Sequence, residues 1–180
     1  MDRRQPLPRL WMMSDERQGE SLLPALRRLP PGAGIVFRHY SLPSEERRAL
    51  FDEAFTIARE VGSIMLLAAP PAVALEWGAD GSHGWEGAAT SGLLRSVSVH
   101  DEAEMLTANR FSADLAFVSP VFETRSHPGA AVLGMKELTR LSTKAQMPVI
   151  ALGGMNAERA KLLEGTGIYG WAAIDAWSEA

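Results

Sequence analysis

The chain of 180 residues contains no cysteine, so it cannot form a disulfide, a thiolate nucleophile or a zinc site of the cysteine type. Lysine is scarce as well, because 15 of the 18 basic residues are arginine and only Lys136, Lys144 and Lys161 are lysine. There is no basic run, and the formal net charge is -4. Nucleic acids and anionic membranes require a basic face, so we expect neither as a partner.

Long hydrophobic segments are also absent. The longest apolar run, Ile64–Leu75, has 12 residues and contains Pro70 and Pro71, so it is too short and too broken to span a bilayer. The segment Met1–Arg9 mixes charge with proline and does not resemble a secretory signal. With 46% hydrophobic residues, the composition predicts one globular domain over residues 1–180, located in the cytoplasm.

Short apolar runs alternate with amphipathic stretches along the whole length. The runs predict strands at Leu10–Met13, Gly34–Tyr40, Ser63–Ala68, Ala79–His83, Val97–His100, Ala113–Phe122, Val149–Leu152 and Tyr169–Ile174. The stretches between them predict helices at Ser21–Leu29, from Ser44 as N-cap to Gly62, at Pro71–Gly78, Asp101–Phe111 and Lys136–Lys144, and from Asn156 as N-cap to near Gly165.

Eight strands, many of them continuously apolar, predict an α/β fold with parallel strands buried on both faces. A doubly wound sheet gives the same alternation, but the count of eight favours a closed (β/α)8 TIM barrel. The chain is compact for such a barrel, and few residues follow the eighth strand. We therefore expect its final helix to be reduced or missing. The apolar surface thus exposed near Trp171 and Trp177 predicts a homodimer.

Polar residues collect just past the expected strand ends, where the active site of a barrel lies. They are Arg38, His39 and Tyr40 after the second strand, His83 after the fourth, Ser98 and His100 at the fifth, Ser119 and Glu123–His127 after the sixth, Gly153 and Gly154 after the seventh, and Asp175 after the eighth.

Two of these features suit phosphate. Arg38 can grip a phosphate with two parallel hydrogen bonds, and the Gly153-Gly154 pair lets backbone N–H groups approach an anion. Each also has a simpler interpretation: Arg38 could form a structural ion pair with a strand-end carboxylate, and the glycines could form a tight turn that needs no ligand. The residues alone leave both interpretations open.

Taken together and in order, the strand-end motifs resemble the thiamine-phosphate synthase and TenI superfamily. The resemblance covers nearly the whole chain. It rests on 10-LWMMSD-15, Arg38, 78-GADGSH-83, 98-SVH-100 with Glu104, Ala113-Asp114 leading to 119-SPVFET-124, 148-PVIALGGM-155 and 170-GWAAI-174.

This resemblance implies a (β/α)8 barrel, usually a dimer, in thiamine biosynthesis. A synthase of this type joins hydroxymethylpyrimidine diphosphate to thiazole phosphate and releases pyrophosphate, usually with Mg²⁺. The implied catalytic residues are Arg38, Ser98, His100, Thr124 and His127. The implied substrate- and phosphate-binding residues are Arg38, Tyr40, His83, Glu123, Gly153, Gly154 and Asp175.

The sequence departs from the family pattern where diphosphate and metal would bind. Tyr40 and His127 replace lysines, Ala68-Ala69 replaces an Asn-Asp pair, Ala88 replaces a second metal-binding aspartate, and Asp175 replaces a serine. Because Mg²⁺ is held by hard oxygen ligands, no metal-binding residue is expected, although Glu86 is a conceivable substitute. An aspartate at position 175 would repel phosphate unless it were paired or protonated.

Three functions remain open. The first is a divergent synthase. The second is a TenI-like thiazole tautomerase or isomerase in which His100 or His127 moves a proton, since Pro120 stands in place of the catalytic histidine of that branch. The third is a non-catalytic homologue that binds a ligand or a partner.

Overall fold

The computed structural model describes residues 6–88, 90–124, 129 and 131–177. Its elements are β1 (Leu10–Met13), η1 (Glu16–Ser21), α1 (Leu22–Arg27), β2 (Gly34–Phe37), α2 (Ser44–Glu60), β3 (Ile64–Leu67), α3 (Pro71–Glu76), β4 (Gly81–His83), β5 (Leu94–Val99), α4 (Glu102–Arg110), β6 (Leu115–Val118), α5 (Gly134–Ser142), β7 (Val149–Ala151), α6 (Ala157–Ala160), η2 (Lys161–Leu163) and β8 (Gly170–Ala173).

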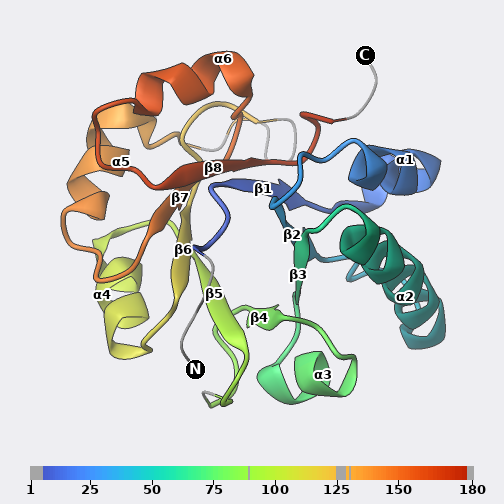
Figure 1. Ribbon diagram of the computed structural model, residues 1–180. Coiled ribbons are helices and arrows are strands. Elements are labelled where there is room, and N and C mark those ends of the chain that lie inside the picture. Colours follow the sequence, from blue (N-terminus) through green and yellow to red (C-terminus); the bar gives the residue numbers. More distant parts are fainter. Residues whose placement is uncertain (1–5, 89, 125–128, 130, 178–180) are drawn as a thin grey trace. The chain divides into compact units, whose positions relative to one another are not determined.

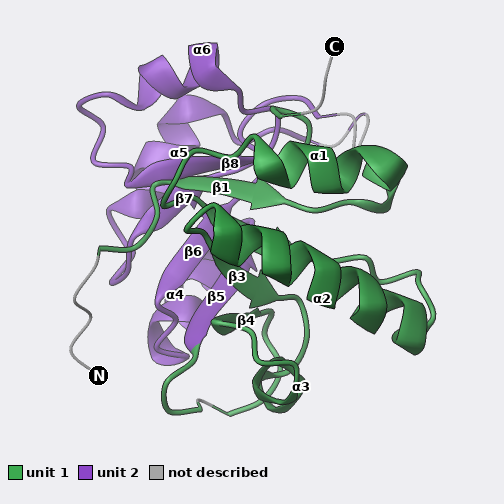
Figure 2. Cartoon of the chain, turned by 45° about the vertical axis from the view of Figure 1, so that its right-hand side comes forward, with its two compact units in different colours: residues 1–93, 174–180 green, residues 94–173 purple. Residues whose placement is uncertain are grey.

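The strands follow one another in the order β1 to β8 of a closed barrel, with helices between them (Figure 1). This order confirms the predicted (β/α)8 fold. The chain divides into two compact units: unit 1 comprises residues 1–93 and 174–180, and unit 2 comprises residues 94–173 (Figure 2). Among the described residues, no helix is long and apolar enough to cross a membrane.

In unit 1, β1 to β4 are parallel, and their side chains alternate between two buried faces. Met12, Ile35, Phe37, Met65 and Leu67 pack against residues of α1 and α2 in one hydrophobic cluster. The intervening residues belong to the other face and are buried as well; they include Trp11, Met13, Val36 and Leu66. Burial of both faces explains why these strands are continuously apolar.

In unit 2, β5 to β8 are also parallel, with Ser98 paired to Phe117, Phe117 to Ile150, and Ile150 to Gly170. Asn156 is the N-cap of α6, as predicted, because its side chain accepts a hydrogen bond from the N–H of Arg159 at 2.9 Å.

Some predicted boundaries are wrong. Ser44 is not an N-cap: it is the first residue of α2, and Pro43 takes the cap position in an extended conformation. β5 begins at Leu94 rather than Val97 because Arg95 is buried, with its N–H bonded to Asp114 and its guanidinium over the ring of Phe111. In both places local contacts override the apolar pattern.

The predicted reduction of the final helix stays a prediction. No helix follows β8 through Trp177, the last residue that the structure describes. The Trp177 side chain packs against the hydrophobic cluster of unit 1, and its carbonyl accepts hydrogen bonds from Arg28 at 2.8 and 3.2 Å. The segment after β8 therefore covers part of the apolar surface that the sequence left exposed, and the homodimer stays a prediction.

Candidate functional site

Arg38 is fixed at the end of β2 by three hydrogen bonds. Its Nε donates to the Ser14 carbonyl at 2.6 Å, its Nη2 donates to Asp15 Oδ2 at 2.8 Å, and its backbone N–H donates to Ser14 Oγ at 2.8 Å. Alternation along the strands places Arg38 and Asp15 on the same face as Val36 and Met13. The ion pair that the sequence left open is therefore present.

This pairing leaves most of the guanidinium available. Arginine has five N–H donors, and two are used. The hydrogens on Nη1 and the second hydrogen on Nη2 have no acceptor among the described residues. Because the side chain is only 22% exposed, a ligand that took these donors would meet a partly desolvated and oriented cation.

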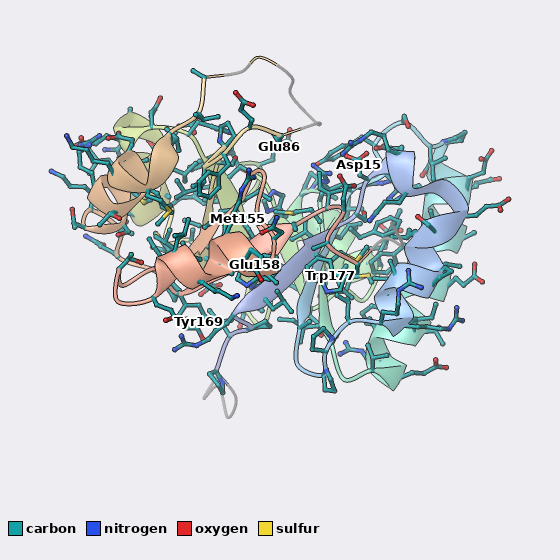
Figure 3. The ribbon with its side chains drawn as sticks, turned by 90° about the horizontal axis from the view of Figure 1, so that it is seen from above. Asp15, Glu86, Met155, Glu158, Tyr169 and Trp177 are labelled. Atoms are coloured by element: carbon teal, nitrogen blue, oxygen red, sulfur yellow. The ribbon has the colours of Figure 1, made fainter. Side chains whose placement is uncertain are left out.

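Asp15, labelled in Figure 3, is the carboxylate of this cluster. It also caps η1, accepting from the backbone N–H and Nε of Arg17. Burial alone would raise the pKa of Asp15, but the hydrogen bonds from Arg17 and the positive charge of Arg38 hold it below its ordinary value. Asp15 is therefore charged at neutral pH and neutralises part of the positive charge on Arg38.

Ser14 and His39 form a second pair, on the face of the strands that meets the helices. Ser14 Oγ lies 2.9 Å from His39 Nδ1, both residues are buried, and the imidazole stacks on the ring of Phe37. His39 adopts a left-handed backbone with φ of 45°, which ends the strand here. Burial lowers the pKa of His39, so its ring is neutral at neutral pH. The pair supports Arg38, because Ser14 bonds both residues.

His83, at the end of β4, is a second neutral imidazole. Burial and then the charge of Arg38 lower its pKa to about 4. His83 therefore lies within electrostatic reach of Arg38, and its role in binding substrate stays a prediction. Tyr40 is 64% exposed, and the guanidinium of Arg47 lies 5.5 Å from the centre of its ring.

Arg47 was not identified from the sequence, although it belongs to the same region. Its Nε donates to the Arg38 carbonyl at 2.8 Å and its Nη2 to the Ala68 carbonyl at 2.9 Å, which ties the ends of β2 and β3 together. Its guanidinium also lies 5.6 Å from the ring centre of Trp77. The position in the first turns of α2 gave no signal, since solvent-exposed arginines are common there.

The residues of this region do not fit Mg²⁺. The expected ligand positions hold the methyl side chains of Ala68, Ala69 and Ala88, and the Ala68 carbonyl already accepts from Arg47. Among the described residues, no group of three or more histidines and carboxylates could hold a metal ion. The guanidinium of Arg47 thus places a positive charge at the end of β3, where Mg²⁺ would need carboxylate ligands.

In unit 2, the predicted catalytic residues are only partly placed. His100 is exposed, and its Nδ1 and backbone N–H bond the Glu104 carboxylate at 2.8 and 2.7 Å. Ser98 and Thr124 are partly buried. His127 lies outside the described residues. The roles assigned to these side chains stay predictions.

The Gly153-Gly154 turn has a packing requirement of its own. Both residues have positive φ, 93° and 61°. A Cβ on Gly153 would lie 2.7 Å from Pro120 Cα, and one on Gly154 would lie 2.4 Å from the Glu123 carbonyl oxygen. The segment after β6 therefore requires glycine at both positions whether or not a ligand binds.

The same turn nevertheless offers donors. The backbone N–H groups of Gly153, Gly154 and Met155 have no acceptor among the described residues. Arg159 lies beside them, bonded to the Gly154 carbonyl and 4.6 Å from the ring centre of Phe122. Sequence reasoning missed this arginine, and the turn combines free donors with a nearby positive charge.

Asp175, expected near phosphate, belongs to unit 1. Its charge helps to raise the pKa of Arg17, after the larger effect of the hydrogen bond from Arg17 to Asp15. Asp175 thus lies within electrostatic reach of Arg17. The positive charge of Arg17 offsets part of the repulsion that Asp175 would exert on a phosphate.

Comparison with known proteins gives a consistent result. A family model described as "Thiamine monophosphate synthase" matches residues 13–177. A curated Aquifex aeolicus protein named "Putative thiamine-phosphate synthase 2" is 32% identical over 184 residues, with 96% of this chain and 99% of that protein covered. Thiamine-phosphate synthase of Syntrophomonas wolfei is 29% identical over 181 residues, with 93% and 87% covered.

Among solved structures, thiamine phosphate pyrophosphorylase from Pyrococcus furiosus superposes with a TM-score of 0.78 and 26% identity, covering 94% of this chain and 86% of that one. FabK from Thermotoga maritima, with a TM-score of 0.70 and 14% identity, shares the fold alone. Because the family model spans residues 13–177, the chain belongs to the thiamine monophosphate synthase family.

Proposed function

We propose that this protein acts in thiamine biosynthesis as a thiamine-phosphate synthase, joining hydroxymethylpyrimidine diphosphate to thiazole phosphate. In this reaction the bond between the pyrimidine methylene carbon and the diphosphate oxygen breaks, and the thiazole nitrogen forms a new bond to that carbon. Pyrophosphate leaves with the electrons of the broken bond. No protein nucleophile is required.

The observation that carries this proposal is the state of Arg38. Negative charge grows on the diphosphate as the carbon–oxygen bond breaks, so a fixed cation that strengthens its contact at that moment lowers the barrier. Arg38 is held in place by Ser14 and Asp15 through one edge of its guanidinium, and its remaining donors are open. We assign it to the diphosphate.

The Gly153-Gly154 turn supports a separate role in binding the thiazole phosphate. Its free N–H groups and the neighbouring Arg159 suit a phosphate group. His83 and Tyr40 would contribute neutral hydrogen bonds near Arg38. Ser98, Thr124 and Glu123 would line the substrate pocket, with His100 and His127 as further polar groups. The homodimer belongs to the same proposal and is tested by sedimentation at micromolar concentration.

The test is to incubate the purified protein with both substrates and to measure thiamine phosphate and pyrophosphate, with and without Mg²⁺. We expect equal amounts of the two products, and a strong loss of both in an Arg38→Met variant. If neither product forms under either condition, the synthase assignment is wrong. Binding of a precursor without turnover would then favour the non-catalytic homologue.

A further inference from the structure

Two arginines of unit 1 bind groups at the ends of its strands, and both use Nε and Nη2 to do so. Arg38 uses Nε and Nη2 for the Ser14 carbonyl and Asp15, and Arg47 uses Nε and Nη2 for the carbonyls of Arg38 and Ala68. In each case Nη1 and one hydrogen of Nη2 have no acceptor among the described residues. Each arginine therefore keeps an oriented set of free donors.

The two arginines differ in how their charge is balanced. Arg38 is paired with Asp15. Among the described residues, Arg47 bonds two neutral carbonyls and lies over the faces of Tyr40 and Trp77, and no carboxylate bonds it. Burial lowers the pKa of Arg47, while Tyr40 and Glu16 oppose this effect. Arg47 is thus a partly desolvated cation without a bonded counter-ion.

Nearby groups show that the arginines act on a common region. The charges of both Arg38 and Arg47 affect the pKa of Tyr40 and of His39. Glu16 is a further acid near this region, and its Oε1 accepts hydrogen bonds from the backbone N–H and hydroxyl of Ser41. An anion beside Tyr40 would therefore lie within electrostatic reach of two guanidinium groups, and Arg47 has no bonded carboxylate among the described residues.

We propose that Arg47, together with Arg38, binds the diphosphate group in place of a divalent cation, so that diphosphate binding by this protein does not require Mg²⁺. This inference rests on the proposed function. The argument for Arg47 comes from the end of β3. Alanines occupy the positions expected to hold metal ligands there, and Arg47 bonds the carbonyl of one of them, Ala68. A guanidinium there provides positive charge that needs no carboxylate ligands.

The experiment is calorimetric titration of the full-length protein with inorganic pyrophosphate, in EDTA and in excess Mg²⁺. We expect binding in EDTA that is no more than about 2-fold weaker than in Mg²⁺, since two charge-assisted contacts persist without the metal. This comparison uses the unaltered protein, so it decides the inference even if a variant fails to fold. Binding that appears only with Mg²⁺ would overturn it.

Variants then test the residue. Arg47→Met should weaken binding in EDTA by about 10-fold or more, which is the effect of losing a hydrogen bond from a charged donor. Arg47→Lys should recover part of the loss, because it keeps the charge. The control is Arg48→Met: Arg48 is the next residue of α2, pairs with exposed Asp52, and should leave affinity unchanged. Arg47→Met with unaltered affinity and a native melting temperature would contradict the inference.

The outcomes also separate this inference from the proposed function. Product formation together with pyrophosphate binding that appears only with Mg²⁺ would keep the synthase assignment and remove the role of Arg47. Failure of the unaltered protein to bind pyrophosphate in either condition, together with absence of product, would remove both.

Discussion

In unit 1, the ends of β1, β2 and β4 carry the titratable side chains Asp15, Arg38 and His83, and Arg38 is held by an ion pair with Asp15 and a hydrogen bond to the Ser14 carbonyl. In unit 2, the turn after β7 offers backbone N–H groups on two glycines that touch the segment after β6. The difference teaches that the two regions should fail in different ways. Substitutions in unit 1 should change binding and pH dependence, whereas substitutions at the glycine turn should first change folding.

The largest effect is expected at Gly154. Gly154→Ala places a Cβ 2.4 Å from the Glu123 carbonyl in a left-handed backbone, so strain and overpacking together should lower the free energy of unfolding by about 4 kcal/mol. Urea denaturation measures this. The matched control is Gly167→Ala, which has positive φ but open space around its Cβ and should cost about 1 kcal/mol. An equal decrease in unfolding free energy in the two variants would mean that close packing against Glu123 adds nothing to the cost of substituting Gly154.

The next effect sharpens the unit 1 side of the comparison. Arg38→Met removes an oriented cation with open donors, and pyrophosphate affinity should fall by about 100-fold. Calorimetric titration measures it. Arg28→Met serves as the control, because Arg28 is exposed and its Nε and Nη2 donate to the Trp177 carbonyl, far along the chain from the strand end that holds Arg38. A stable Arg38→Met protein that binds normally would leave Arg38 as a structural ion pair.

A pH effect should also be confined to unit 1. The pKa of His83 is about 4 in the folded state against 6.5 ordinarily, so the unfolded chain binds more protons between these values. Stability is complete above about pH 6.5 and falls as pH decreases towards 4. Between pH 7 and pH 5, this one group should cost the protein about 2 kcal/mol.

The measurement is the unfolding free energy of the unaltered protein and of His83→Asn at both pH values. The variant should lose about 2 kcal/mol less between them. His100→Asn, which alters an exposed histidine of unit 2, should retain the pH dependence of the unaltered protein. If both variants lose the same unfolding free energy between pH 7 and pH 5, burial of His83 does not contribute to the pH dependence of stability.

The sequence predicted the fold because apolar runs and helical stripes are local signals, and the Asn156 cap depends on contacts within three residues. The boundary at Ser44 was wrong because a proline took the cap, and the start of β5 was missed because a buried arginine interrupts an apolar pattern. These errors concern element ends, where tertiary contacts decide.

The site shows the same limit. Arg38 and His83 could be found because they lie at strand ends, and the carboxyl ends of the strands meet at one edge of a barrel. The pairing of Arg38 with Asp15, 23 positions away, and the two carbonyl contacts of Arg47 depend on the register of β1, β2 and β3. A surface arginine on a helix has no local signature that announces such contacts, so Arg47 could not be predicted.

The smallest effect tests whether Asp15 opposes or assists binding by Arg38. Asp15→Asn keeps a side-chain oxygen for the cap of η1 but removes the negative charge that faces Arg38, whose orientation is still held by the Ser14 carbonyl at 2.6 Å. Pyrophosphate should therefore bind about 3-fold more tightly, consistent with removal of one partly screened like charge. Asp52→Asn, an exposed carboxylate paired with Arg48, is the control and should leave affinity unchanged. Weaker binding in Asp15→Asn would show that the ion pair orients the guanidinium, and unit 1 would then depend on precise geometry as strictly as the glycine turn of unit 2.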